Sequence, residues 1–138
     1  MILCLAFLLV LNSNIEQDTM LLPFHGGRIV LTGDHAKNKH RGLFIRPSGD
    51  DSVRSCSDGK VQRIWQIGTN WCTTINLEDT SFTYAQMDTV MVHPGEMISM
   101  GDVIGERRMI PNDYNSIILI VFKGNKELDP EMFLLYKK

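Results

Sequence analysis

From Leu22 onward the chain is a succession of short runs rich in β-branched and aromatic residues, and this feature limits the fold more than any other. The runs are separated by Gly, Asp, Asn and Pro, which favour turns. No window of a dozen residues carries an amphipathic helical pattern. The runs are GRIVLTG, GLFIRP, DSVRSCSDGKVQRIWQIG, WCTTINLED, SFTYAQMD and SIILIVFKGN. The sequence therefore predicts an all-β fold built from antiparallel sheets.

Three turn signals refine this prediction. The Asp58-Gly59 dipeptide predicts a primed hairpin turn between SVRSC and KVQRIW, because such turns need positive φ. The segment EDTS, from Glu78 to Ser81, is expected to join two antiparallel strands. In HPGEMISMGDVIG, Gly95 and Gly101 are expected to adopt backbone angles that residues with a Cβ resist. We interpret these two glycines as structural, forming a tightly turned β ribbon.

The length and charge of the chain exclude several classes of protein. The chain has 138 residues, which is the usual size of one domain, and no repeat or internal linker interrupts it. The net charge is -2, and no run of Lys or Arg suggests a nucleic acid or an anionic membrane as the partner.

The N-terminal segment Ile2 to Leu11 is apolar throughout and is followed by NSNIEQD. It is too short to span a bilayer, but it has the length of a signal-peptide hydrophobic region. We interpret residues 1–17 as a signal peptide or its remnant and 18–138 as the domain, so the mature chain has no stable membrane span. No Lys or Arg precedes the run and no small-residue cleavage site follows it, so a buried strand or helix of the domain stays open as an alternative.

Cys56 and Cys72 allow two interpretations. In an exported protein they could form a disulfide, whereas in a reducing compartment they would be ordinary buried thiols. The sequence has no C-x-x-C pair and no Cys/His spacing of a structural zinc site.

The order of these pieces resembles the lysostaphin-type, or LytM-like, zinc endopeptidases of bacterial peptidoglycan. The resemblance covers nearly the whole chain after residue 20. It follows the family's P-x-x-G-x-x-x-x-G entry, H-x-G-x-D motif, D-G-x-V hairpin, Y-A-H strand, glycine-turned ribbon, H-x-H strand and closing D-P. The matching segments are LPFHGGRIVLTGDHAKNKHRGLFIRP, VRSCSDGKV, FTYAQMDTVMVHPGEMISMGDVIG and VFKGNKELDPEMFL. The resemblance implies a LytM-like peptidase domain over residues 18–138, with the duplicated β architecture of that family.

The resemblance also implies that the catalytic centre is degenerate. The family needs three protein ligands for zinc and further histidines that act on the attacking water. His40 occupies the first ligand position, but Phe44 replaces the ligand aspartate and Ile118 replaces the ligand histidine. Gln86 and Ser116 replace the two catalytic histidines, and an amide cannot take up a proton near neutral pH. With His40 left as a relic, we expect no zinc cofactor and no peptidase activity.

The function that follows from this resemblance is a non-catalytic binding or regulatory module of the bacterial cell envelope, exported or periplasmic. Its partner would be an envelope protein, such as a wall hydrolase, or peptidoglycan. A protein partner is favoured because apolar residues replace the ligands on the floor of the cleft. The residues expected to line this cleft are His40, Phe44, Trp71, Gln86, Ser116 and Ile118.

Two alternatives stay open at this point. One is an active zinc metallopeptidase with a rearranged ligand set drawn from Asp34, His35 and His93. The other is a lipoyl- or biotinyl-like β adaptor domain, which shares the G-D-x-I-G turn. Such carriers present a modified lysine in an M-K-M hairpin tip, and this sequence contains no such motif.

Overall fold

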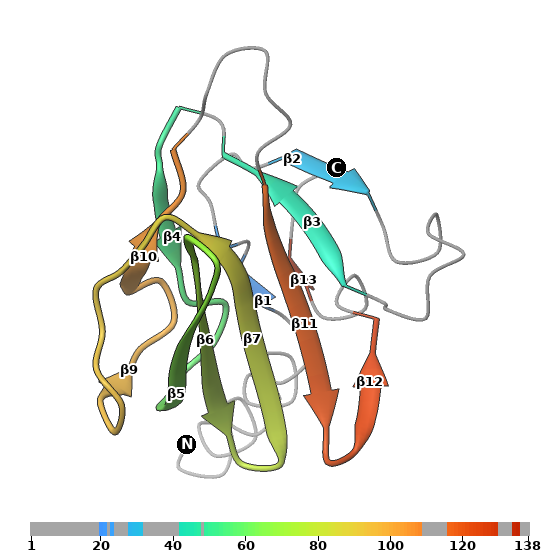
Figure 1. The fold of residues 1–138 in the computed structure, drawn as a ribbon. Coiled ribbons are helices and arrows are strands. Elements are labelled where there is room, and N and C mark those ends of the chain that lie inside the picture. The colour runs from blue at the N-terminus through green and yellow to red at the C-terminus, as the bar shows by residue number, and fades with distance from the viewer. Residues whose placement is uncertain are drawn as a thin grey trace, which may run out of the picture.

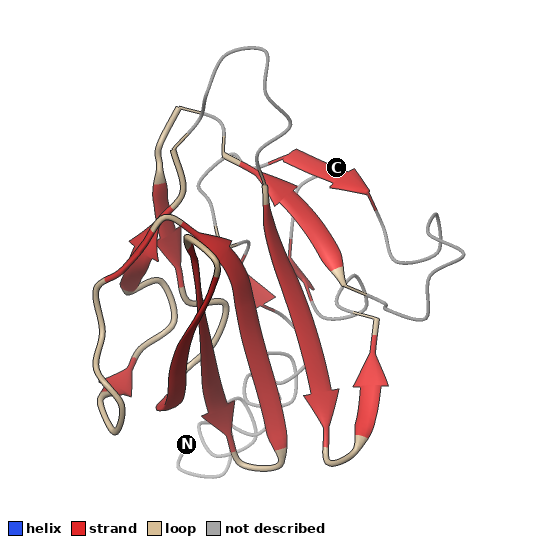
Figure 2. Cartoon of the chain, viewed as in Figure 1, coloured by secondary structure: helices blue, strands red, loops and turns tan. Residues whose placement is uncertain are grey.

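The computed structural model describes residues 20–21, 23, 28–31, 42–47, 49–108, 116–129 and 134–135. These residues form strands, turns and loops without a helix (Figure 2), which confirms the predicted all-β fold. Within them there is accordingly no helix of the length and hydropathy needed to cross a membrane.

The largest sheet has the strand order β2-β3-β11-β7-β6-β5-β9, with β12 paired to β11 (Figure 1). All of its pairs are antiparallel, as the sequence predicts. Its strands are β2 (Arg28–Leu31), β3 (Leu43–Arg46), β5 (Gly59–Ile67), β6 (Asn70–Leu77), β7 (Thr80–Met87), β9 (Met97–Ile98), β11 (Ile117–Lys123) and β12 (Lys126–Leu128).

A second, smaller sheet has the antiparallel order β4-β10-β8. Its strands are β4 (Ser52–Arg54), β10 (Val103–Glu106) and β8 (Thr89–Val90). One short parallel pair, β1 (Met20–Leu21) with β13 (Leu134–Leu135), brings together segments from the two ends of the chain.

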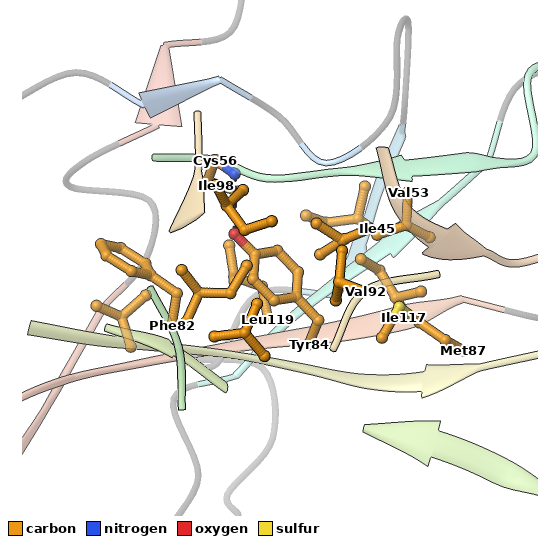
Figure 3. Close-up of a cluster of buried hydrophobic side chains, with 14 of the residues drawn as sticks. Ile45, Val53, Cys56, Phe82, Tyr84, Met87, Val92, Ile98, Ile117 and Leu119 are labelled. Atoms are coloured by element: carbon orange, nitrogen blue, oxygen red, sulfur yellow. Dashed lines mark hydrogen bonds between the residues drawn. The ribbon is translucent and has the colours of Figure 1, made fainter. Parts of the chain in front are cut away.

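The hydrophobic core lies between the large sheet and the β4-β10-β8 sheet (Figure 3). Leu119 on β11 pairs with Tyr84 on β7 and with Leu43 on β3, and all three side chains are fully buried. Val53 and Ile104 enter the same cluster from the smaller sheet. Buried and less buried residues alternate in β3, β7 and β11. One face of the large sheet therefore faces the core, and its opposite face, here called the outer face, carries other side chains.

Two of the three predicted turns are confirmed. β6 and β7 form an antiparallel hairpin around Glu78 and Asp79. Gly95 and Gly101 have φ angles of 89° and 90°, in the region that favours glycine.

The predicted primed turn at Asp58-Gly59 is wrong. β4 pairs with β10 rather than with β5, and Gly59 is the first residue of β5, with φ outside the positive region. The physical reason for glycine here is close packing, since a Cβ would lie 2.6 Å from the Asn76 carbonyl oxygen. Asp58 instead accepts a hydrogen bond from the backbone N–H of Met100 at 2.8 Å. The segment thus carries the chain from one sheet to the other.

Candidate functional site

The outer face of the large sheet brings together side chains from five neighbouring strands. Cross-strand partners point to the same side of a sheet, so the register defines which residues share this face. One row runs Trp65, Cys72, Ala85, Ile118, Phe44, and the next runs Arg63, Thr74, Thr83, Ile120. The Thr74 and Thr83 hydroxyls lie 2.8 Å apart and form a hydrogen bond, which confirms that the two side chains share one side.

Phe44 and Ile118 are direct cross-strand partners on this face. Ile118 also pairs with Ala85 on its other side, and all three residues are half-buried. The chain before Phe44 lies close to the same isoleucine, because a Cβ on Gly42 would come within 2.8 Å of Ile118 Cγ2. Apolar side chains therefore lie next to one another at the two positions where the resemblance to the family predicts zinc ligands.

Gln86 lies next to this row in a β-bulge. Trp71 pairs with Met87 and Thr73 pairs with Tyr84, so Cys72 alone faces both Ala85 and Gln86. The extra residue gives Gln86 a φ of 66°, which costs a residue with a Cβ on the order of 1 kcal/mol. The backbone is thus held in an uncommon conformation at the position of a predicted site residue.

Cys72 is buried opposite this bulge. Burial raises the pKa of the Cys72 thiol, and a hydrogen bond with the Gln86 backbone acts in the opposite direction. Cys56 lies in the core instead, and both thiols are free. The structure therefore favours the interpretation of two ordinary buried thiols over a disulfide.

The other predicted site residues are distributed differently. Ser116 is buried directly before β11, two residues from Ile118. His40, together with Asp34 and His35, lies outside the described residues. His93 is exposed in the loop before β9, where its backbone N–H donates to the Glu96 carboxylate at 3.4 Å.

The structure does not bring Trp71 together with Ile118 and Phe44. Trp71 pairs with Met87 and packs against the core, on the other side of the sheet. The tryptophan on the outer face is Trp65, which is partly exposed and lies under the Arg63 guanidinium, 4.6 Å from the ring centroid. A register shift between Val61 and Arg63 reverses the alternation of β5 and turns Trp65 outward. Only the aromatic character of Trp65 marked it in the sequence, since simple alternation from buried Val61 would point it into the core.

These residues do not fit a zinc ion. The phenyl ring of Phe44 and the aliphatic side chain of Ile118 carry no lone pair, and zinc sites in proteins need three or four N, O or S donors. Over the described ranges, no group of three or more His, Cys, Asp or Glu residues is placed to hold a metal.

Two antiparallel sheets and a ribbon turned at Gly95 and Gly101 define the class of the protein as an all-β domain. The family model for Peptidase family M23 matches residues 38–130, about two thirds of the chain. The chain therefore belongs to Peptidase family M23.

Solved structures share this fold at low sequence identity. Helicobacter pylori Csd3, in an orthorhombic crystal, is similar with a TM-score of 0.62 and 20% identity, over 84% of this chain and 32% of that one. The cbpa protein of L. salivarius REN is similar with a TM-score of 0.61 and 22% identity, over 78% of this chain and 80% of that one. A chain of the SpoIIQ-SpoIIIAH pore-forming complex is similar with a TM-score of 0.56 and 16% identity, over 67% of this chain and 63% of that one.

This chain spans about a third of the length of the Helicobacter protein. No curated protein sequence matches it. At these identities the solved structures establish the fold alone.

Proposed function

We propose that this chain is a catalytically degenerate M23 domain that serves as a non-catalytic binding or regulatory module of the bacterial cell envelope. The observation that carries the proposal is the direct pairing of Phe44 with Ile118 on the outer face. A site that held zinc here would need a donor at each position. Apolar side chains at these positions pack against each other, so close packing takes the place of zinc coordination in stabilising this part of the sheet.

The neighbouring positions support the same proposal. Gln86 offers an amide, which donates and accepts hydrogen bonds but does not transfer protons near neutral pH. Ser116 lies buried beside β11, without an imidazole that could orient a water molecule. The polar groups left at the site are suited to recognising a partner by hydrogen bonds.

The partner we propose is an envelope protein, such as a wall hydrolase, in preference to peptidoglycan itself. Half-buried apolar side chains at Phe44, Ile118 and Ile120 offer a surface that suits an apolar partner better than a hydrated glycan. A fold neighbour, SpoIIQ, is found in a complex with SpoIIIAH, so this fold is compatible with protein assembly.

Export to the periplasm or cell envelope belongs to the same proposal. It is supported by membership of Peptidase family M23 and by the apolar run Ile2 to Leu11, with residues 1–17 as the proposed signal peptide. Intact-mass measurement of the protein from its native host tests it, because the mature chain should begin between Ser13 and Thr19. Retention of Met1 would contradict export by this route.

The absence of catalysis is tested by elemental analysis of the purified protein together with a turnover assay on isolated cell wall. We expect substoichiometric zinc and no release of soluble wall fragments. One zinc per chain with wall hydrolysis would overturn the proposal in favour of an active peptidase with a rearranged ligand set.

Binding is tested by affinity capture from envelope extracts in parallel with sedimentation on purified peptidoglycan. The double variant Gln86→Ala/Trp65→Ala should weaken the interaction by roughly 1 to 3 kcal/mol if the outer face is the contact surface. Met91→Ala is the matched control, because Met91 is 50% exposed and lies beyond β8, away from the outer face. Strong co-sedimentation with bare peptidoglycan would contradict the proposal of a protein partner and would identify the cell wall as the partner instead.

A further inference from the structure

Among the described residues, the edge of β5 that faces away from β6 is unpaired over most of its length. β9 pairs only with Gly59 and Lys60, at the beginning of the strand (Figure 1). The loop before β9 adds two backbone hydrogen bonds at Val61, with Glu96 and with Gly95. From Gln62 to Ile67, no described residue pairs with the side of β5 that faces away from β6.

This edge is accessible and its backbone is regular. Gln62, Arg63 and Gln66 are exposed, and Ile67 is 64% exposed. After the register shift, residues 63 to 67 pair without interruption with residues 74 to 70 of β6. The segment contains no Lys or Pro, the residues that commonly protect sheet edges. A length of five residues matches that of a typical strand.

The hairpin geometry shows which backbone groups are free. β5 and β6 are joined by two residues, Gly68 and Thr69, and Gly68 has a φ of 61°. In a hairpin with a two-residue loop, the flanking pair Ile67 and Asn70 is the hydrogen-bonded type, and the types then alternate along the ladder. The N–H and C=O of Gln66 therefore point away from β6, toward the open edge.

The charges on β5 itself are positive, although Glu96 lies beside Val61 where the loop before β9 meets the strand. Arg63 stacks on Trp65 and forms no ion pair within the part of the chain that the structure describes. Lys60 is exposed on the same strand, and neither β5 nor β6 contains an Asp or Glu. This positive edge belongs to a chain whose net charge is -2, so it favours an acidic occupant.

We propose that an extended segment of a partner protein adds to the edge of β5 as a further antiparallel strand, with a carboxylate against Arg63 and apolar side chains against Trp65 and Ile67. Main-chain hydrogen bonds would give affinity and alternate side chains would give specificity. The inference rests on the proposed binding function and names its contact site. A second copy of this chain fits less well, because pairing of two β5 strands about Trp65 would place Arg63 opposite Ile67 and leave it without an acid.

The test uses the full chain and synthetic peptides, with binding followed by fluorescence anisotropy. The first peptide is Thr-Val-Thr-Val-Thr-Glu-Thr. Paired antiparallel to β5, it places its Glu against Arg63 and its two Val against Trp65 and Ile67. The second peptide carries Lys in place of Glu. We expect the acidic peptide to bind about tenfold more tightly, a difference of roughly 1.4 kcal/mol. N-methylation of the amides on one edge of the acidic peptide should abolish binding, whereas methylation on the other edge should preserve it.

Two variants of the chain complete the test. Arg63→Glu should reverse the preference between the two peptides. Gln66→Pro removes an N–H that points away from β6 and should abolish binding, whereas the control Gln66→Ala keeps the N–H and should retain it. If Gln66→Pro does not fold, the N-methylated peptides still test the backbone contact.

Several results would overturn the inference. Equal binding of the two N-methylated peptides would show that the peptide makes no backbone contact with the edge of β5. If the chain forms a dimer that the Gln66→Pro change dissociates, the occupant of the edge is a second copy of the chain. If the chain binds peptidoglycan and the Arg63→Glu variant does not, the ligand of this edge is the cell wall rather than a protein segment. A captured partner protein that binds both variants normally would overturn the edge contact and leave the proposed function standing. Zinc-dependent wall cleavage would overturn the proposed function itself.

Discussion

Phe44 on β3 and Ile118 on β11 face each other directly across the outer face of the large sheet, although 73 positions separate them in the sequence. The resemblance seen in the sequence predicts that these two positions correspond to two of the family's three metal ligands. The pairing means that donors placed at these positions would be close enough to bind one ion, so the assignment can be tested by restoring them.

The double variant Phe44→Asp/Ile118→His is expected to bind about one zinc ion per chain, with His40 as the third ligand. Each single variant should bind less zinc, because two ligands form an incomplete site. Zinc content after dialysis, measured by elemental analysis, checks the expectation. A folded double variant that stays free of zinc would show that the alignment of these positions is wrong, and removal of bound zinc by a further His40→Ala change is the control.

Much of the fold could be predicted from local patterns. Runs rich in β-branched and aromatic residues predicted strands such as β7 and β11, and positive φ at Gly95 followed from its place in a glycine-turned ribbon. The neighbouring positions of Phe44 and Ile118 followed from the order of the family's motifs rather than from any local pattern.

The errors have a common physical origin in backbone irregularity. Asp58-Gly59 has the composition of a hairpin turn, but the glycine serves close packing against Asn76 and the chain crosses between sheets. The register shift near Gln62 reverses which side of β5 faces the core, so Trp65 reaches the outer face, whereas Trp71 on β6 packs against the core. A bulge leaves little trace in hydrophobic alternation, because it depends on the pairing of distant strands.

Tyr84→Phe should destabilise the protein by about 1 to 3 kcal/mol, because the Tyr84 hydroxyl accepts a buried hydrogen bond from the Cys56 backbone N–H at 2.8 Å. The change leaves that N–H without its partner inside the core. Urea unfolding monitored by tryptophan fluorescence measures the loss. Thr83→Val is the comparison, since it breaks the Thr74–Thr83 hydroxyl pair without removing a partner from the backbone, and it should cost less. An equal loss in the two variants would contradict this account.

Stability should fall at alkaline pH because of Cys56. Burial raises the pKa of the Cys56 thiol from 9.0 to about 12, so the unfolded state loses this proton at lower pH than the folded state. The contribution of the thiol is therefore complete below pH 9 and is lost as pH rises toward 12, at roughly 1.4 kcal/mol per pH unit. Burial also raises the pKa of Tyr84, which adds to the loss at higher pH.

Urea unfolding at a series of alkaline pH values checks this dependence. The Cys56→Ala variant should be less stable near neutral pH and should show a shallower decline above pH 9, because the contributions of Cys72 and Tyr84 remain while that of Cys56 is gone. Parallel curves for the two proteins would show that the thiol does not control alkaline unfolding.

Gly95→Ala should destabilise the protein by about 1 to 2 kcal/mol through the backbone alone. The glycine has a φ of 89°, and a Cβ placed there would meet no neighbouring atom within 4 Å. Gly95→Asn should cost less, because Asn tolerates positive φ better than Ala does. Thermal unfolding of the two variants checks the order, and equal losses would point to a cause other than the backbone angle.

Gly42→Ala should also destabilise the protein, but for a steric reason that a second substitution can relieve. Its Cβ would lie 2.8 Å from Ile118 Cγ2 and 3.4 Å from Ile120 Cγ1, while the φ of Gly42 is outside the positive region. Such overpacking typically costs about 1 to 3 kcal/mol. In the double variant Gly42→Ala/Ile118→Ala the clash disappears. The loss of stability in the double variant should therefore be smaller than the sum of the losses in the two single variants, by roughly 1 kcal/mol. The pair Gly95→Ala/Ile118→Ala is the control and should be additive, because no atom of Ile118 lies within 4 Å of a Cβ at that position. Additive losses in the Gly42 pair would show that the isoleucine moves aside freely and that the outer face is looser than the structure indicates.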